Sequence, residues 1–389
     1  MSSAEARPPS DAAAPFRPGA LAAMAWLHFV NDGASNFLPG VLPVVLVSLG
    51  ESPALAGTLM FVLVAGQGIQ PLTGLLGARV DGWRMMGLGV FGTAVGAALV
   101  GLSAHFAMLL AVLASIGLCN ACFHPQAFTS VRHYSGPRAG MGMAVMMLGG
   151  EVGRGVWPLI ATATVVWGSL RSLWIPAGAA ALSVPLILRF LPRPPADKPV
   201  WRVQLTGRRR ATLELLAYVS LRGLVISGVV TYLPILWAKR AGGLMGGAGV
   251  IALMLGVGII GTIGGGHLTD LVGRKPVVAA SSAGMALCLA LMAWGPGPSP
   301  WVGAALLGIP AFATFPATTL VGQDLFPENK PFGSGLAMGL GNALGAGLMA
   351  LLALDVGRLT VVGFFAVLAG VALVSLPLAL RLPAPHSGA

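Results

Sequence analysis

The chain has 389 residues and a net charge of +11, and only 9% of its residues are charged, against about 25% in soluble domains. So little charge excludes a water-soluble domain, and the 56% share of hydrophobic residues predicts an integral membrane protein. The positive charge does not predict a nucleic-acid partner, because the lysines and arginines lie in loops between apolar segments rather than in one patch.

The chain begins with an Ala- and Pro-rich stretch, residues 1–17, which predicts a disordered tail. It is not a signal peptide, because the apolar segment that follows is too long and contains Asp32. Twelve apolar segments come next, each long enough to cross a hydrocarbon core of about 30 Å as a helix of about 20 residues. They are 20–48, 54–77, 85–103, 107–131, 139–164, 171–191, 211–236, 246–269, 276–294, 301–324, 332–354 and 359–381.

Two of these stretches contain no Asp, Glu, Lys or Arg, namely Met85–Val131 with 47 residues and Pro276–Gln323 with 48 residues. Their starts lie 191 residues apart, about half of the chain, and each stretch holds two predicted helices. The chain is therefore predicted to be an all-α protein with an internal repeat, forming two pseudo-symmetric six-helix bundles. The predicted parts are the bundles 18–191 and 211–382, the basic linker 192–210, and a C-terminal tail, 383–389.

The distribution of basic residues predicts the orientation in the membrane. With both termini in the cytoplasm, 17 of the 23 lysines and arginines fall in cytoplasmic segments. Arg171, Lys239, Arg240 and Arg358 fall on the other side, and Arg154 and Arg222 fall within spans. The sequence therefore predicts a multi-pass protein with cytoplasmic termini.

The ten residues that close the eighth segment have the pattern G-x-L-x-D-x-x-G-R-K, with Gly266, Asp270, Gly273, Arg274 and Lys275 at its fixed positions. The pattern resembles the loop signature of the major facilitator superfamily. Its glycines allow close helix approach, and its Asp is suited to a neighbouring helix N-terminus, where the helix dipole favours an anion. A degenerate copy, 74–79, closes the second segment, with Ala78 in place of the Asp.

Several further motifs resemble the fosmidomycin-resistance-type exporters of bacteria. They are His28-Phe29-Val30-Asn31-Asp32, Phe123-His124-Pro125, Gly149-Gly150 with Pro158, and Gln323-Asp324-Leu325-Phe326-Pro327. The resemblance covers essentially the whole chain. It implies a monomeric twelve-helix facilitator in the bacterial inner membrane, without a cofactor, that exports drugs or metabolites by alternating access and proton antiport. Leu113 stands where many drug–proton antiporters have an Arg, and Glu151 and Arg154 are unusual for the fifth helix.

Charges within the spans are costly, at least about 2.5 kcal/mol each, so each one needs a reason. We expect Asp32 and Glu151 to couple protons, and Arg222 and Arg154 to bind an anionic substrate. Three structural alternatives remain open: a hydrogen-bonded Asp32, a self-neutralising pair of Glu151 and Arg154 on one helix face, and an ion pair between Arg222 and Asp32.

Uncharged polar residues within the spans are further candidates for substrate contacts, although a helix–helix hydrogen bond is the commoner role for any one of them. They are His28, Asn31, His124, Gln126, Tyr232 and Asn342. The expected partners are thus a small organic anion, protons and the lipid bilayer.

Two other functions remain open. A transporter of a metal ion or metal chelate would use His28, Asp32, Cys119, Cys122 and His124, although the three cysteines of the chain are more typical of apolar packing. A membrane enzyme or receptor is disfavoured, because the sequence has no nucleophile–base arrangement, no Walker loop and no soluble sensing domain.

Overall fold

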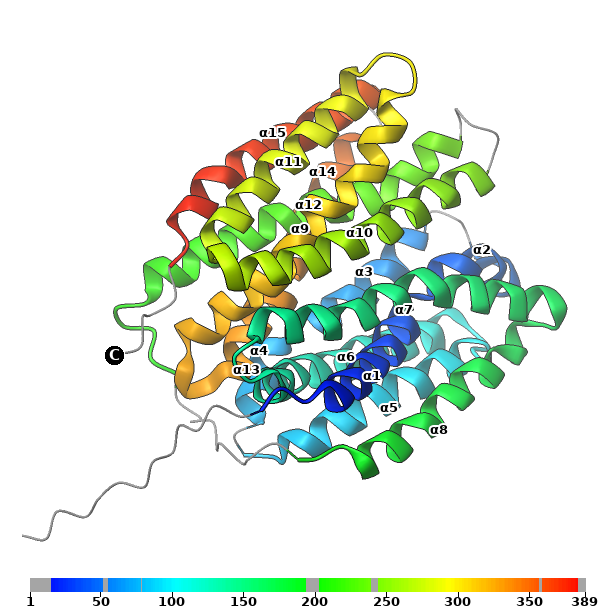
Figure 1. Cartoon of the computed structure of the whole chain (residues 1–389). Helices are drawn as coiled ribbons and strands as arrows, with labels where there is room; N and C mark the ends of the chain where they lie inside the picture. The colour runs from blue at the N-terminus through cyan, green and yellow to red at the C-terminus, as the bar shows by residue number, and fades with distance from the viewer. Residues whose placement is uncertain are drawn as a thin grey trace, which may run out of the picture.

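The computed structural model describes residues 15–51, 55–77, 79–193, 203–238, 244–356 and 359–383, and it places them mainly in long helices. Figure 1 shows two groups of helices lying against each other, with α1 to α8 in one group and most of α9 to α15 in the other. The predictions for residues 1–14, Ala78, 194–202, Lys239, Arg240, Arg358 and 384–389 lie outside the described residues.

The first half of the chain follows the first six predicted segments. Its helices are α1 (Pro18–Asn36), α2 (Leu38–Ser48), α3 (Ala56–Gln67), α4 (Gln70–Leu76), α5 (Gly82–Val100), α6 (Phe106–Ser135), α7 (Ala139–Trp167), the 3-10 turn η2 (Leu170–Leu173) and α8 (Trp174–Phe190). The first two segments are each divided, and in both a proline, Pro39 or Pro71, lies in the first turn after the break. A proline has no N–H for the preceding turn and therefore begins a new helix.

The second half follows the other six segments. Its elements are α9 (Arg209–Ala238), α10 (Leu244–Val272), α11 (Arg274–Trp294), α12 (Ser299–Leu325), η3 (Pro327–Asn329), α13 (Lys330–Gly335), the π-helical turn η4 (Leu336–Leu340), α14 (Gly341–Val356) and α15 (Val361–Arg381). The π-turn lies in the Gly-rich eleventh segment, beside the boundary with the first half.

Among the described residues, ten helical segments are long and apolar enough to span a membrane. The two predicted segments that fall short by hydropathy are α1 with α2, and α7. These are the helices that carry Asp32 and the pair Glu151 and Arg154. Both carry charge within a span, which is costly in lipid, whereas α9 reaches the apolarity of a span with the buried Arg222 in it.

Backbone contact between helices depends on glycine at a few positions. A Cβ atom on Gly149 of α7 would lie 1.9 Å from the carbonyl oxygen of Ala25 in α1, and one on Gly153 would lie 2.5 Å from that of Phe29. Helices α1 and α7 therefore touch along their backbones, which is how small residues hold helices together in lipid. This contact brings Glu151 and Arg154 close to α1.

The two halves meet most tightly at the end of the molecule that carries residues 266–275, called here the motif end. Asp270 accepts hydrogen bonds from the backbone N–H groups of Gly140 (2.9 Å) and Met141 (3.0 Å), in the first turn of α7. A Cβ atom on Gly140 would lie 2.4 Å from the carbonyl oxygen of Gly266. On the other side of the interface α13 packs on α4 and α6. The halves are therefore closed together at the motif end.

Candidate functional site

A small cavity of about 80 Å³ lies between the two halves. Its lining from the first half is His28, Asp32, Asn36, Gln67, Gln70, His124, Met147, Glu151 and Arg154, and from the second half Phe315, Met338 and Asn342. Sites for drug-sized ligands are about 300 Å³ or more, so an organic substrate needs the halves to separate further than they do here.

A larger hollow of about 500 Å³ lies elsewhere in the first half, between the end of α2, the end of α5 and the turn before η2. Arg171, its one charged lining residue, is exposed, and none of the buried charges reaches it. Because buried charges in a membrane protein mark function, the smaller cavity between the halves is the candidate site.

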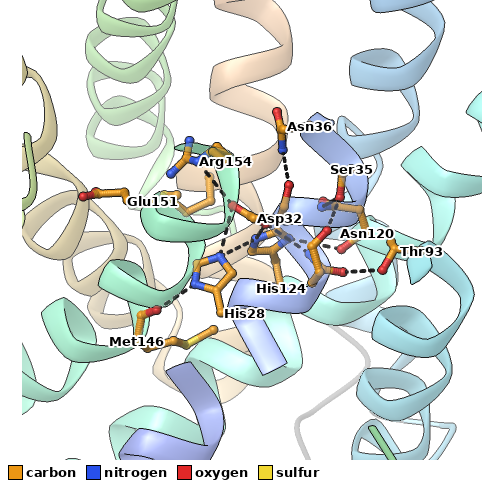
Figure 2. A network of polar contacts seen from close by, with 12 residues as sticks. His28, Asp32, Ser35, Asn36, Thr93, Asn120, His124, Met146, Glu151 and Arg154 are labelled. Carbon is orange, nitrogen blue, oxygen red and sulfur yellow. Dashed lines mark hydrogen bonds and ion pairs between the residues drawn. The ribbon is translucent and has the colours of Figure 1, made fainter. Parts of the chain in front are cut away.

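Asp32 is the centre of a buried polar cluster in this cavity (Figure 2). Its Oδ2 lies 3.3 Å from Nε2 of His28, which is one helical turn earlier on α1. Its Oδ1 lies 3.1 Å from Nε2 of His124, on α6. The two imidazole nitrogens are themselves only 3.1 Å apart. Two ring nitrogens and both carboxylate oxygens, from two helices, thus lie close together.

The orientation of both imidazole rings is set by backbone carbonyl groups. Nδ1 of His28 lies 2.9 Å from the carbonyl oxygen of Met146, and Nδ1 of His124 lies 3.2 Å from that of Asn120. A carbonyl oxygen can only accept, so in both rings Nδ1 carries the hydrogen and donates it. In the neutral rings both Nε2 atoms are therefore acceptors, directed toward Asp32 and toward each other.

Further groups hold Asp32 from the other sides. Nδ2 of Asn31 donates to its Oδ1 at 3.1 Å, and Nε of Arg154, on α7, lies 3.5 Å from its Oδ2. The hydroxyl of Thr93, on α5, donates to Asn31 at 3.3 Å. Arg154 is thus paired with Asp32, on another helix, and the carboxylate of Glu151 bonds instead to Thr262. The side chain of Arg154 remains 29% exposed, so its guanidinium is accessible from the cavity.

Glu151 connects the two halves in the middle of the molecule. One of its carboxylate oxygens accepts a hydrogen bond from the hydroxyl of Thr262, on α10, and both residues are buried. Its other oxygen, Oε2, is buried without a hydrogen-bond partner. Glu151 is therefore an acid at the interface between the halves with half of its hydrogen-bonding capacity unused.

Arg222, on α9, is fully buried and is held by neutral groups. Its guanidinium donates to Thr314, Thr318 and Asn342, each at 3.1 Å, and lies 4.2 Å from the ring centre of Phe315. The expected alternative of a pair with Asp32 is wrong for this conformation, because Asp32 is surrounded by the two histidines and Arg154. Phe315 and Asn342 line the cavity, and Arg222 lies behind them.

Comparison with known proteins decides the family. The family model of the Major Facilitator Superfamily matches residues 24–339. This chain belongs to the Major Facilitator Superfamily. Two curated relatives of this facilitator are an uncharacterised MFS-type transporter, YfnC, of Bacillus subtilis strain 168 (26% identity over 340 residues, 82% of each chain) and the fosmidomycin resistance protein of Escherichia coli K12 (25% over 355 residues, 86% of each chain).

Solved structures agree with this facilitator in fold. A variant of FucP, the fucose:proton symporter of E. coli, superposes with a TM-score of 0.73 over 93% of this chain and 98% of that one, at 16% identity. The human organic anion transporter MFSD10 superposes with a TM-score of 0.75 over 92% and 99%, at 18% identity. Such low identities support the fold alone.

Other predicted positions of the facilitator lie away from the cavity or outside the described side chains. Gln126 donates to the carbonyl oxygen of Thr73 at 3.2 Å and packs near Gly77 and Gly82, toward the motif end, because it is on the face of α6 that meets α4. The side chain of Tyr232 lies outside the described part of the structure.

The two cysteines proposed as metal ligands do not join the polar cluster. Cys119 packs toward α5, where a Cβ atom on Gly92 would lie 2.5 Å from its sulfur, and the backbone of Cys122 lies against Gly89 of the same helix. Both follow the α5-facing side of α6, whereas His124 faces α1. Of the five residues expected for a metal, three come together.

Several residues of the site were not singled out from the sequence. Thr262, Phe315, Met338 and Met147 are ordinary residues of apolar spans, and no local pattern distinguishes them. Gln67 and Gln70 were visible as rare amides in an apolar segment, but the face on which they lie could be assigned only with the packing known.

Proposed function

We propose that this facilitator exports a small organic anion across the bacterial inner membrane in exchange for protons, by alternating access. The observation that carries the proposal is the position of Glu151 and Arg154. Within one turn of α7, the carboxylate of Glu151 is hydrogen-bonded to the opposite half, and the guanidinium of Arg154 lines the cavity. A proton site and an anion site thus adjoin each other at the interface that must open and close.

Arg154 is the proposed first contact of the substrate. It lines the cavity, is partly exposed, and is held at 3.5 Å by Asp32 without a hydrogen bond at its Nε. A planar guanidinium binds carboxylate, phosphate or phosphonate through two parallel hydrogen bonds. An arriving anion can therefore take the place of Asp32 at this guanidinium. Arg222 becomes a second contact when Phe315 and Asn342 move.

Glu151 is the proposed proton carrier. A buried carboxylate with one unpartnered oxygen is costly in its charged form, and a proton removes that cost. Because the same carboxylate accepts from Thr262 across the interface, gain or loss of the proton changes a contact between the halves. The sequence alone predicted both Asp32 and Glu151 for this role. The surroundings of Asp32 instead suit a fixed anion that holds Arg154 until substrate arrives.

The names of the relatives and structural neighbours support export as the direction of transport and a small organic molecule as the cargo. A relative named for resistance to fosmidomycin fits export of a drug, one structural neighbour is named an organic anion transporter, and another a fucose:proton symporter. The distribution of basic residues among the loops supports a cytoplasmic position for the motif end. With that orientation, the described conformation is closed toward the cytoplasm.

The direct test uses purified protein in proteoliposomes with an imposed pH gradient. A thermal-shift screen of organic anions, including fosmidomycin, at two pH values first selects a ligand. We expect the gradient to drive accumulation of that anion, and Glu151→Gln to abolish gradient-driven accumulation while binding persists. Glu214→Gln is the matched control, because Glu214 pairs with the exposed Arg210 far from the cavity.

Two outcomes would contradict the proposal. Gradient-driven transport that Glu151→Gln leaves intact would remove Glu151 as the proton carrier. Anion binding that is unchanged in Arg154→Gln and in Arg222→Met would remove the anion site.

A metal ion as cargo is less well supported by the geometry. The three described residues that converge as metal ligands, His28, Asp32 and His124, all belong to the first half. Cargo in an alternating-access protein is held between two halves that move apart. A site within one half can bind an ion without carrying it.

A further inference from the structure

We infer that His28, Asp32 and His124 form a binding site for a divalent transition-metal ion, for which Zn²⁺ is the natural probe. The inference concerns binding and does not rest on the proposed function. It holds whether or not an organic anion is the cargo, and its test needs no transport measurement.

The spacing of the three ligand atoms fits tetrahedral zinc. Zinc lies about 2.0–2.2 Å from imidazole nitrogen and carboxylate oxygen, which places neighbouring ligand atoms of a tetrahedron about 3.3 Å apart. Here Nε2 of His28 lies 3.3 Å from Oδ2 of Asp32, Nε2 of His124 lies 3.1 Å from Oδ1, and the two Nε2 atoms lie 3.1 Å apart. Each carboxylate oxygen is thus at ligand–ligand spacing from one imidazole. A metal ion therefore fits between them with little movement of any side chain.

The hydrogen bonds behind the rings favour the same conclusion. Metal-binding histidines usually donate their second N–H to a carbonyl or carboxylate, which fixes the ring and leaves the other nitrogen free to bind. Met146 and Asn120 provide such carbonyl groups for His28 and His124. Two neutral Nε2 acceptors 3.1 Å apart, both facing a carboxylate, require a shared cation. An additional proton or a metal ion would meet that requirement.

The surroundings complete an open site. The cluster borders the cavity, so water or an anionic ligand can take a fourth position, as in zinc sites with three protein ligands. The charged groups that face it are both on α7: Arg154 opposes a metal ion, and Glu151 offsets Arg154. Two imidazoles and one carboxylate suit zinc, nickel or copper and not the oxygen-preferring magnesium or calcium.

The experiment measures Zn²⁺ binding to the purified full chain, stripped with a chelator and carrying no polyhistidine tag. Isothermal titration is expected to show one Zn²⁺ per chain. Single substitutions His28→Ala, His124→Ala and Asp32→Asn are each expected to weaken binding by at least about tenfold. In the unsubstituted protein, Co²⁺ is expected to give the visible absorption spectrum of a tetrahedral site, and Zn²⁺ to displace it.

The matched control is the double substitution Cys119→Ser, Cys122→Ser. These cysteines are also on α6 and also potential ligands, but they face α5, so Zn²⁺ affinity is expected to stay unchanged. His267→Ala controls for binding to an exposed histidine. The Co²⁺ spectrum needs no substitution and therefore decides the matter even where a variant fails to fold.

Absence of saturable binding, with no Co²⁺ spectrum, would overturn the inference and leave a shared proton as the cation of the cluster. Stoichiometric binding that survives all three ligand substitutions would overturn it as well.

Discussion

Arg132 and Asp324 form an ion pair of 2.9 Å across the boundary between the two halves. Arg132 is in the last turn of α6, and Asp324 is at the end of α12, where it also pairs with Arg274 at 2.5 Å. Terminal guanidinium nitrogens (Nη) of two arginines thus share one carboxylate at the motif end. Removing that carboxylate leaves two guanidinium groups facing each other.

We therefore expect Asp324→Asn to weaken closure at the motif end. The pair is partly exposed, so its loss is worth about 1 kcal/mol, or about a fivefold shift in population. Hydrogen–deuterium exchange is expected to rise in α4 and α13, which pack together across the interface. In Glu214→Gln, which removes a carboxylate from an ion pair within one helix, exchange in α4 and α13 is expected to stay unchanged. Unchanged exchange in Asp324→Asn would exclude the pair as a closing contact.

A second prediction concerns Asp270, which accepts two backbone hydrogen bonds at the start of α7. Asp270→Ala leaves the N–H groups of Gly140 and Met141 without their acceptor and removes an anion from a helix N-terminus, a loss of about 1–3 kcal/mol. Faster exchange of these two amides is the expected result. Asp81→Ala is the comparison, because Asp81 accepts from Trp83 within its own half. Equal effects of the two substitutions on the first turn of α7 would contradict the prediction.

A third prediction concerns Arg222. Its partners Thr314 and Thr318 also bond to backbone carbonyls, so Arg222→Met leaves few unmet hydrogen bonds and removes a buried charge. Replacing buried charge by an apolar side chain is often neutral or stabilising. We expect the melting temperature to hold or rise while anion binding weakens. A fall in both the melting temperature and the anion affinity would show that Arg222 has a structural role only.

A fourth prediction tests the contact of α1 with α7. Gly149→Ala forces a methyl group against the backbone of Ala25, and overpacking of this kind costs about 1–3 kcal/mol. The melting temperature is expected to fall. On the same helix, Gly155→Ala meets nothing within 4 Å and gains helix propensity, so its melting temperature is expected to stay or rise. The opposite order would show that the two backbones are not in contact.

The helices themselves were predictable because lipid requires about twenty apolar residues in a row. The predicted segments coincide with one long helix each or with a series of shorter helical elements, and ten of the described helical segments are long and apolar enough to span a membrane. Their internal breaks were less predictable, since the first segment ends one helix at Phe37 and begins another before Pro39. A hydropathy pattern reports the environment of a segment and not its local backbone geometry.

The site was predictable within a helix and not between helices. The i, i+4 spacing of His28 and Asp32 places them on one face, and the structure shows them in contact. That Arg154 reaches Asp32, and Arg222 does not, depends on which backbones touch. Contacts such as that of Gly149 with Ala25 decide this, and one sequence does not reveal them.

The charged lining residues all come from the first half, and the second half contributes Phe315, Met338 and Asn342. One half of the chain therefore provides the charged lining of the cavity, while the other half provides apolar and amide groups. Phe315 and Asn342 also contact Arg222, so substitutions there alter both which molecules fit and the surroundings of a buried charge. In the proposed mechanism, proton coupling depends on Glu151 in the first half, so the fit of the substrate can be changed from the second half without removing the proton carrier.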